Sequence, residues 1–220
     1  MKTSEYTFEN YVMTPSNRLV CLAAQKICET PGAYNPLYIF GPSGVGKTHL
    51  LQAIAAEYES KGQSAICLSS NQFLEEMIEA IRNGTNVEFR EKYHQVDVLL
   101  IDRLQYIAGK EATQEELFNI VGKRLLDLKQ TVFAGNVHPS QIPILDPELS
   151  ACLAGGLCIE IPTPDFEGTS EIIFQKLKAH GIDWPMEACR YVALNTSSGA
   201  NQIEGEINKI LACRETLEKA

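Results

Sequence analysis

The sequence has no long apolar run, no paired cysteines and no surplus of basic residues. None of its hydrophobic stretches reaches the about 20 residues that a membrane-spanning helix needs. Its first residues lack the basic-then-apolar layout of a secretion signal. The seven cysteines are scattered without a C-x-x-C pair, which argues against a zinc knuckle and against a disulfide framework. We therefore expect a cytoplasmic protein with no membrane partner.

The charge balance limits the kind of partner that the whole chain can bind. Lysine and arginine number 19 against 28 aspartates and glutamates, which gives a formal net charge of −9 at pH 7. Strong electrostatic binding of nucleic acid requires clustered basic residues that neutralise phosphates. Any DNA affinity must therefore come from a local basic patch, from a partner or from another domain, and we expect DNA binding to be weak.

Five short apolar segments alternate with stretches of helical periodicity. These segments are Leu37 to Phe40, Ser64 to Leu68, Val98 to Ile101, Thr131 to Ala134, and Leu157 to Ile161. Strands that alternate with helices in this way form a parallel sheet with crossover helices on both faces. The sequence therefore predicts an α/β fold around a five-stranded parallel sheet.

Helix signals fill the gaps between these segments and continue after the last one. One predicted helix follows Pro15-Ser16-Asn17, a second begins at Thr48, and we expect Ser70-Asn71 to cap a third that ends near Asn83-Gly84. The box Thr113-Gln114-Glu115-Glu116 predicts the start of a fourth.

The strand signals stop after Pro162-Thr163-Pro164. Three helical segments follow, from Glu167 to Ala179, from Met186 to Asn195 and from Gln202 to Leu217. This change of pattern predicts an α/β domain over residues 1–164 and a small all-helical domain over residues 165–220.

The most informative motif joins the first apolar segment to the helix that follows it. It matches G-x-x-x-x-G-K-[ST] at every fixed position and consists of Gly41, Pro42, Ser43, Gly44, Val45, Gly46, Lys47 and Thr48. In such a loop the backbone N–H groups surround phosphate oxygens and the lysine reaches the terminal phosphates. The threonine hydroxyl is a ligand for Mg²⁺. The motif also has the context that such a loop requires, a predicted strand before it and a predicted helix after it. It therefore predicts a site for nucleotide phosphates.

A second element of this site follows the third apolar segment. Asp102 ends the run Val98 to Ile101, and a carboxylate at the carboxyl end of a parallel strand lies at the sheet edge where ligands bind. We therefore predict Thr48 and Asp102 as the Mg²⁺ ligands. The next residue is Arg103, where NTPases of this architecture commonly carry a second acid. A guanidinium with a pKa above about 12 is no general base, so hydrolysis is in doubt.

With these residues in hand, the chain resembles the AAA+ domain of the bacterial replication initiator DnaA family. The resemblance is carried by segments that cover most of residues 6–120: Tyr6 to Val12, Pro15 to Leu19, Ala33 to Leu37, Gly41 to Ile54, Val87 to Tyr93, Val96 to Asp102, and Leu104 to Glu116. It implies an AAA+ P-loop fold with a five-stranded parallel sheet between helices, followed by a small helical lid. It also implies ATP or ADP with Mg²⁺ as ligand, and Tyr11, Val12 and Asn17 on the adenine side.

Departures from the family pattern cluster at the positions that act on the terminal phosphate. Arg103 replaces the second acid, and Asn136 stands where the family has a polar sensor, a role that an asparagine can fill. The segment Leu149 to Gly155 occupies the place of the arginine-finger motif without an arginine, and Asn201 falls where the lid arginine would be. Because an arginine finger alone is worth on the order of a thousandfold in rate, we expect very slow hydrolysis or none.

The resemblance implies a role in the initiation of chromosome replication. We expect a regulator or assembly factor that holds an adenine nucleotide and docks on an initiator, on another replication protein or on a second copy of itself. The duplex-reading domain of the family would lie beyond Ala220, and we expect a naturally short paralogue rather than a cropped piece.

Two other functions and two roles for Arg103 stay open. One alternative is an active ATPase, such as a helicase loader, in which Glu111 or Glu115 activates water. The other is single-stranded DNA binding along Glu79 to Tyr93, with Arg82, Arg90 and Lys92 as phosphate contacts. Arg103 either pairs with Glu111 or Glu115 or clamps the terminal phosphate.

Overall fold

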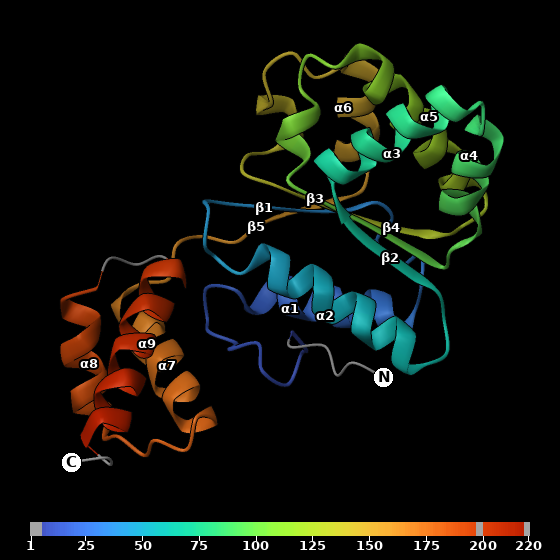
Figure 1. Ribbon diagram of the computed structural model, residues 1–220. Coiled ribbons are helices and arrows are strands. Elements are labelled where there is room, and N and C mark those ends of the chain that lie inside the picture. The colour runs from blue at the N-terminus through green and yellow to red at the C-terminus, as the bar shows by residue number, and fades with distance from the viewer. Residues whose placement is uncertain (1–5, 197–199, 218–220) are drawn as a thin grey trace. The chain divides into compact units, whose positions relative to one another are not determined.

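The computed structural model describes residues 6–196 and 200–217, and strands and helices alternate through the first three quarters of the chain (Figure 1). Five strands form one sheet: β1 (Leu37–Phe40), β2 (Ala65–Ser69), β3 (Val98–Asp102), β4 (Gln130–Gly135) and β5 (Leu157–Glu160). They run parallel in the order β2-β3-β4-β1-β5. The predicted five-stranded parallel sheet is confirmed, and β4 lies between the strand before the phosphate loop and the strand that ends at Asp102.

The helices connect these strands or follow them. They are α1 (Arg18–Glu29), α2 (Lys47–Ser60), α3 (Ser70–Asn83), α4 (Asn86–Gln95), α5 (Glu111–Leu126), α6 (Pro147–Ala154), α7 (Phe166–Ala179), α8 (Met186–Leu194) and α9 (Ala200–Leu217), with short 3-10 turns η1 (Leu104–Ile107) and η2 (Pro139–Gln141). The sequence analysis missed α4 and α6. In α4 only Phe89 and Tyr93 are buried, so its periodicity is faint.

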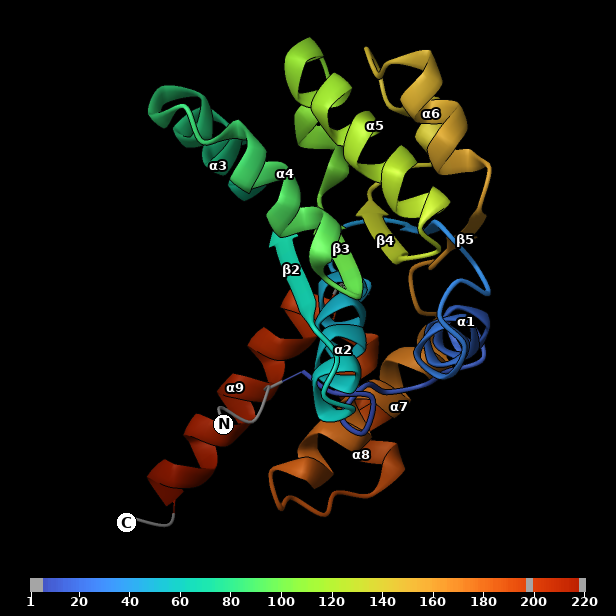
Figure 2. The same cartoon turned by 90° about the vertical axis from the view of Figure 1, so that its right-hand side faces the viewer.

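Helices cover both faces of the sheet, so most of the side chains that point to either face are buried. Helices α1 and α2 lie on one side of it and α3 to α6 on the other (Figures 1 and 2). The residues Tyr38, Leu99, Ile101 and Phe133 belong to the core shared with α3 to α6. Their neighbours along the strands are also buried, as the two-residue period of a strand requires when both faces are covered.

Two helix starts differ from the predictions. The N-cap of α3 is Ser69, whose hydroxyl oxygen accepts the N–H of Gln72, while the Gln72 side chain accepts the N–H of Ser69 at 2.8 Å. The predicted cap at Ser70-Asn71 was thus one residue late. The predicted capping box at Thr113 was wrong, because α5 already begins at Glu111 and the N–H of Thr113 bonds to the carbonyl oxygen of Lys110.

The described chain divides into two compact units. One contains residues 6–11, 19–41 and 47–161, and the other contains residues 12–18, 42–46 and those from 162 onward. Helices α7 to α9 have a small apolar core of their own, which includes Ile173, Leu177, Cys189 and Ile203. Among the described helices, none has the length and apolar character that a bilayer span needs.

A fully buried arginine ties together the end of the sheet that lies opposite the phosphate loop. Arg124 on α5 is 0% exposed. Its guanidinium donates to four carbonyl oxygens and one hydroxyl: those of Tyr93 (2.6 Å), Val96 (2.9 Å), Asp97 (3.3 Å) and Gln130 (2.7 Å), and Thr131 Oγ1 (3.2 Å). Burial lowers the pKa of Arg124 to about 10, so the group stays charged at neutral pH. One side chain thus fixes the end of α4 to the starts of β3 and β4.

We predict that Arg124→Met lowers the free energy of unfolding by more than about 3 kcal/mol, because several buried carbonyl oxygens lose their donors. Chemical denaturation followed by circular dichroism measures this change. Lys123→Met, at the exposed neighbouring position, is the matched control and should change stability by less than about 0.5 kcal/mol. Equal effects of the two substitutions would contradict the assignment.

Candidate functional site

The phosphate loop runs from the end of β1 to the first turn of α2. Gly46 adopts a φ of 95°, in the left-handed region that side chains disfavour. Lys47 follows it as the first residue of α2. The helix therefore begins inside the motif, and its N-terminal turn is of the kind at which helices bind anions.

Lys47 is a buried cation at the start of α2. Lys47 is only 8% exposed, and its Nζ donates to the carbonyl oxygen of Gly41 at 2.7 Å. Burial lowers the pKa of Lys47, and the Asp102 carboxylate opposes this shift. A buried ammonium beside a glycine-rich loop is the group that a nucleotide phosphate stabilises.

Thr48 and Asp102 meet across the intervening strand β4. Thr48 Oγ1 donates to Asp102 Oδ2 at 2.5 Å, and the N–H of Arg103 donates to Asp102 Oδ1 at 2.7 Å. Asp102 is 7% exposed. The carboxylate is therefore held from both sides, and together with the hydroxyl it forms the hard oxygen set that Mg²⁺ prefers. The predicted metal pair is brought together.

Asn136 lies at the same edge of the sheet. It directly follows β4, and β4 sits between β1, which leads into the loop, and β3, which ends at Asp102. Its side chain is exposed. The strand order thus places this carboxamide at the carboxyl edge shared by the loop and the acid, where ligands of open α/β sheets bind.

Arg103 has an unusual backbone conformation, and its side chain forms no ion pair with the described residues. Its φ of 58° and ψ of 46° are left-handed, which costs a residue other than glycine about 1–2 kcal/mol. The Ser70 hydroxyl donates to its carbonyl oxygen at 2.7 Å and helps to hold this conformation. Across the part of the chain that the structure describes, no ion pair of Arg103 occurs, so the pairing with Glu111 or Glu115 is not found.

The residues predicted for the adenine side already make contacts of their own. The Asn17 carboxamide accepts the N–H of Thr14 at 2.8 Å and donates to the carbonyl oxygen of Val12 at 3.0 Å. Asn17 therefore shapes the loop before α1. Tyr11 packs edge-on against the His49 ring at a centroid distance of 5.0 Å. A contact of these residues with adenine stays a prediction.

His49 is a residue that the sequence analysis missed. Its Nε2 lies 3.0 Å from both the Thr7 carbonyl oxygen and Asn10 Oδ1, and its ring also meets that of Tyr6 at 4.9 Å. The residue after Thr48 thus anchors the segment before α1. Its place directly after the motif was the only signal in the sequence.

The remaining family positions lie on helices. The segment Leu149 to Gly155 includes most of α6, where Leu149 and Leu153 are buried in the core. That helix carries no arginine. The side chain of Asn201 lies outside the described residues.

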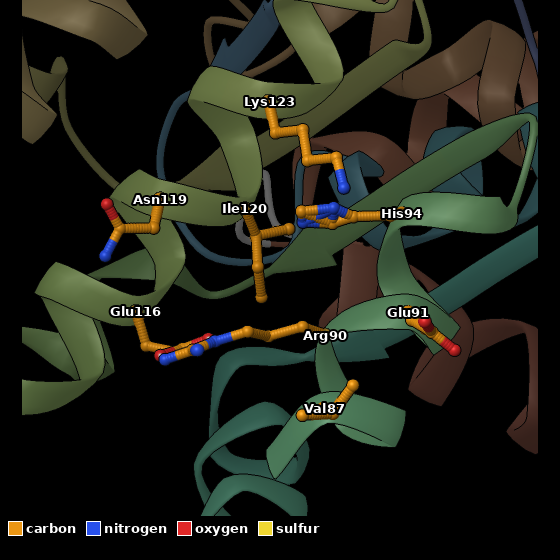
Figure 3. A pocket seen from close by; sticks show the side chains of 8 residues that line it. All are labelled: Val87, Arg90, Glu91, His94, Glu116, Asn119, Ile120 and Lys123. Atoms are coloured by element: carbon orange, nitrogen blue, oxygen red, sulfur yellow. The ribbon is translucent and has the colours of Figure 1, made fainter.

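A surface pocket of about 440 Å³ lies between α4 and α5 (Figure 3). It is lined by Val87, Arg90, Glu91, His94, Glu116, Asn119, Ile120 and Lys123. Arg90 spans it with two hydrogen bonds to Glu116, at 2.6 and 2.7 Å. Because this pocket contains no phosphate-binding loop and its arginine is already paired, it is not the candidate nucleotide site.

A parallel sheet with a phosphate loop after β1 and an acid at the end of β3 defines a nucleotide-binding protein of the AAA+ class. The family model "Bacterial DnaA ATPAse domain" matches residues 2–160. The chain belongs to this family.

Relatives and solved structures agree with this assignment. The chain is 41% identical over 214 residues to the chromosomal replication initiator protein DnaA of Nautilia profundicola, covering 97% of this chain and 49% of that protein. The chain thus spans about half the length of this relative. A structure of DnaA domain III from Thermotoga maritima matches with a TM-score of 0.91 at 34% identity, over 98% of this chain and 91% of that chain.

A second solved structure was determined with ligands. It is a replication initiator DnaA bound to AMPPCP and single-stranded DNA, with a TM-score of 0.89 at 36% identity, over 94% of this chain and 65% of that chain.

Proposed function

We propose that this chain is an adenine-nucleotide-binding regulator or assembly factor in the initiation of bacterial chromosome replication, and that it hydrolyses ATP very slowly or not at all. The observation that carries the proposal is the cluster at the carboxyl edge of the sheet. There, Lys47, Thr48 and Asp102 can hold a triphosphate and its metal, while Arg103 occupies the position of the expected base.

Binding is supported from two directions. The chain has the complete loop, and the related initiator was solved with the ATP analogue AMPPCP. ATP or ADP would place its phosphates at residues 41–48, and Mg²⁺ would be held by Thr48 and Asp102. The metal would supply positive charge that stabilises the phosphates. Tyr11, Val12 and Asn17 remain the proposed adenine side.

Weak hydrolysis follows from the groups that are missing. A general base must accept a proton near neutral pH, and Arg103 does not. In α6 no arginine is present to act on the nucleotide of a neighbouring copy. Each of these groups stabilises the same developing charge in phosphoryl transfer, so their joint loss removes catalysis while leaving the phosphate loop and its metal pair intact.

The partners and location follow from the family. We propose that the protein acts in the cytoplasm, that its α/β part ends near residue 164, and that residues 165–220 form a lid. An initiator, another replication protein or a second copy of the chain is its proposed docking partner.

The proposal predicts tightly bound nucleotide without turnover. Denaturing the purified protein should release ATP or ADP, identified by mass spectrometry, and Lys47→Ala should release none. Phosphate release with Mg-ATP should not exceed that of Lys47→Ala. Turnover that Lys47→Ala abolishes would instead favour the active ATPase, with Glu111 or Glu115 as the water-activating acid. An empty site that binds neither nucleotide would contradict both.

Arg103 is proposed as a clamp on the terminal phosphate, since its guanidinium has no ion pair among the described residues. We predict that Arg103→Asp folds normally. It should shorten the residence time of bound ATP or raise phosphate release above background. Stopped-flow release of a fluorescent ATP analogue measures the first quantity. Arg82→Asp, an exposed arginine on α3, controls for the change of charge. Unchanged retention and turnover in Arg103→Asp would dispose of the clamp.

Single-stranded DNA binding is a second candidate, favoured by the related initiator that was solved with such DNA. In this chain, however, Arg90 pairs with Glu116 and Lys92 pairs with Glu76 at 2.5 Å. Of the three predicted phosphate contacts, only Arg82 forms no ion pair within the described residues. We therefore predict weak binding of an oligothymidine, with a shallow salt dependence that corresponds to about one or two phosphate contacts. A steep slope in fluorescence anisotropy would show that more cations take part.

A further inference from the structure

A buried tyrosine reaches from β1 to the loop that carries Asn136. Tyr38 is 0% exposed, and it lies opposite Phe133 in the β1–β4 register. Its hydroxyl donates to the carbonyl oxygen of Val137 at 3.1 Å. Burial raises the pKa of Tyr38, so the hydroxyl keeps its proton and remains a donor throughout the physiological range.

The same hydroxyl explains why residue 135 is glycine. A Cβ atom at Gly135 would lie 2.1 Å from the Tyr38 hydroxyl oxygen and 3.1 Å from the ring carbon that carries it. The first distance is far inside van der Waals contact. Tyr38 therefore occupies the space that any side chain at position 135 would need, and the two residues fit each other as a pair.

Asn136 lies in the chain between these two contacts. The residue before it, Gly135, is packed against Tyr38, and the carbonyl of the residue after it, Val137, is held by the Tyr38 hydroxyl. One position further on, the His138 ring meets Phe40 of β1 edge-on at 5.5 Å. The backbone that carries Asn136 is thus fixed to β1, the strand that leads directly into the phosphate loop.

We propose that Tyr38 is a positioning residue for Asn136: its hydroxyl sets where the Asn136 carboxamide stands, and thereby how well the site distinguishes a nucleoside triphosphate from a diphosphate. This inference rests on the proposed function together with the sensor role that the family resemblance implies for Asn136, in which its carboxamide donates to the terminal phosphate. A single N–H donated to a charged oxygen is worth on the order of tenfold in affinity. ADP has no terminal phosphate at that place, so its affinity does not depend on the contact.

The test is the ratio of the ADP and AMPPCP dissociation constants, measured by calorimetry with Mg²⁺. The ratio reports the terminal-phosphate contact and is insensitive to a small loss of folded protein, because both ligands bind the same folded molecules. In Tyr38→Phe the preference for AMPPCP should fall about tenfold while ADP affinity is retained. Asn136→Ala should show the same loss, and the double variant should lose no more than either single one.

Tyr58→Phe is the matched control. Tyr58 is also 0% exposed, and its hydroxyl donates to the carbonyl oxygen of Ile27 at 2.8 Å, so the variant removes the same kind of hydrogen bond at another place. It should leave the ratio unchanged. Loss of preference in Tyr58→Phe equal to that in Tyr38→Phe would reduce the effect to general destabilisation and overturn the inference.

A stability arm tests the fit of the pair. Gly135→Ala should lower the thermal unfolding midpoint sharply, whereas Gly135→Ala in a Tyr38→Phe background should lower it much less, because the 2.1 Å clash is gone and only the 3.1 Å contact remains. Equal losses in the two backgrounds would overturn the pairing.

The outcomes separate this inference from the proposed function. A wild-type ratio in Tyr38→Phe, alongside a reduced one in Asn136→Ala, overturns the role of Tyr38 alone. A wild-type ratio in Asn136→Ala overturns the sensor and this inference, while Lys47-dependent binding still supports the proposed function. No binding of either nucleotide by the wild-type protein overturns both.

Discussion

The contact on which the site depends is the hydrogen bond from Thr48, in the first turn of α2, to Asp102 at the end of β3. Strand β4 lies between β3 and β1, the strand that leads into the loop before α2. The hydrogen bond requires β1 and β3 to end at the same level, which the parallel registers of both strands with β4 provide. It also requires the loop to turn at once into α2. A shift of one residue in either register would turn every side chain of that strand to the other face, and Asp102 would no longer meet the hydroxyl.

The buried cations Arg124 and Lys47 have different kinds of partner, one set provided by the fold and the other suited to a ligand. Arg124 is surrounded by fixed carbonyl oxygens at the far end of the sheet, and the fold supplies all of its partners. Lys47 lies at the carboxyl edge of the sheet, where burial lowers its pKa and the Gly41 carbonyl oxygen accepts a hydrogen bond from its ammonium. A phosphate oxygen that took the place of this carbonyl would be a far stronger hydrogen-bond acceptor, because it is charged. The destabilised cation is therefore the one placed where a ligand arrives.

Local patterns predicted what is local. The strands were located within one residue. The loop and Asp102 were correctly placed at one edge, because parallel strands bring their carboxyl ends to the same edge of the sheet. The faintly amphipathic α4 and the short α6 were missed. The left-handed Arg103 was not predictable from residue type, since arginine rarely adopts it. The contact between Tyr38 and Val137 joins residues 99 positions apart. No local sequence pattern predicts a contact over such a separation.

Under the proposed function, the loss of hydrolytic groups changes the kind of signal that the protein reports. In an enzyme that hydrolyses its nucleotide, the bound state depends on the time since ATP was bound. In a protein that only binds nucleotide, the bound state depends on the relative concentrations of ATP and ADP. The difference in affinity between the two ligands sets the ATP-to-ADP ratio at which half of the occupied sites hold ATP. With no acid at residue 103 and no arginine in α6, that difference falls to Arg103 and to a neutral carboxamide. The placement of Asn136 then governs the output, which gives the buried contact between Tyr38 and Val137 a consequence beyond packing.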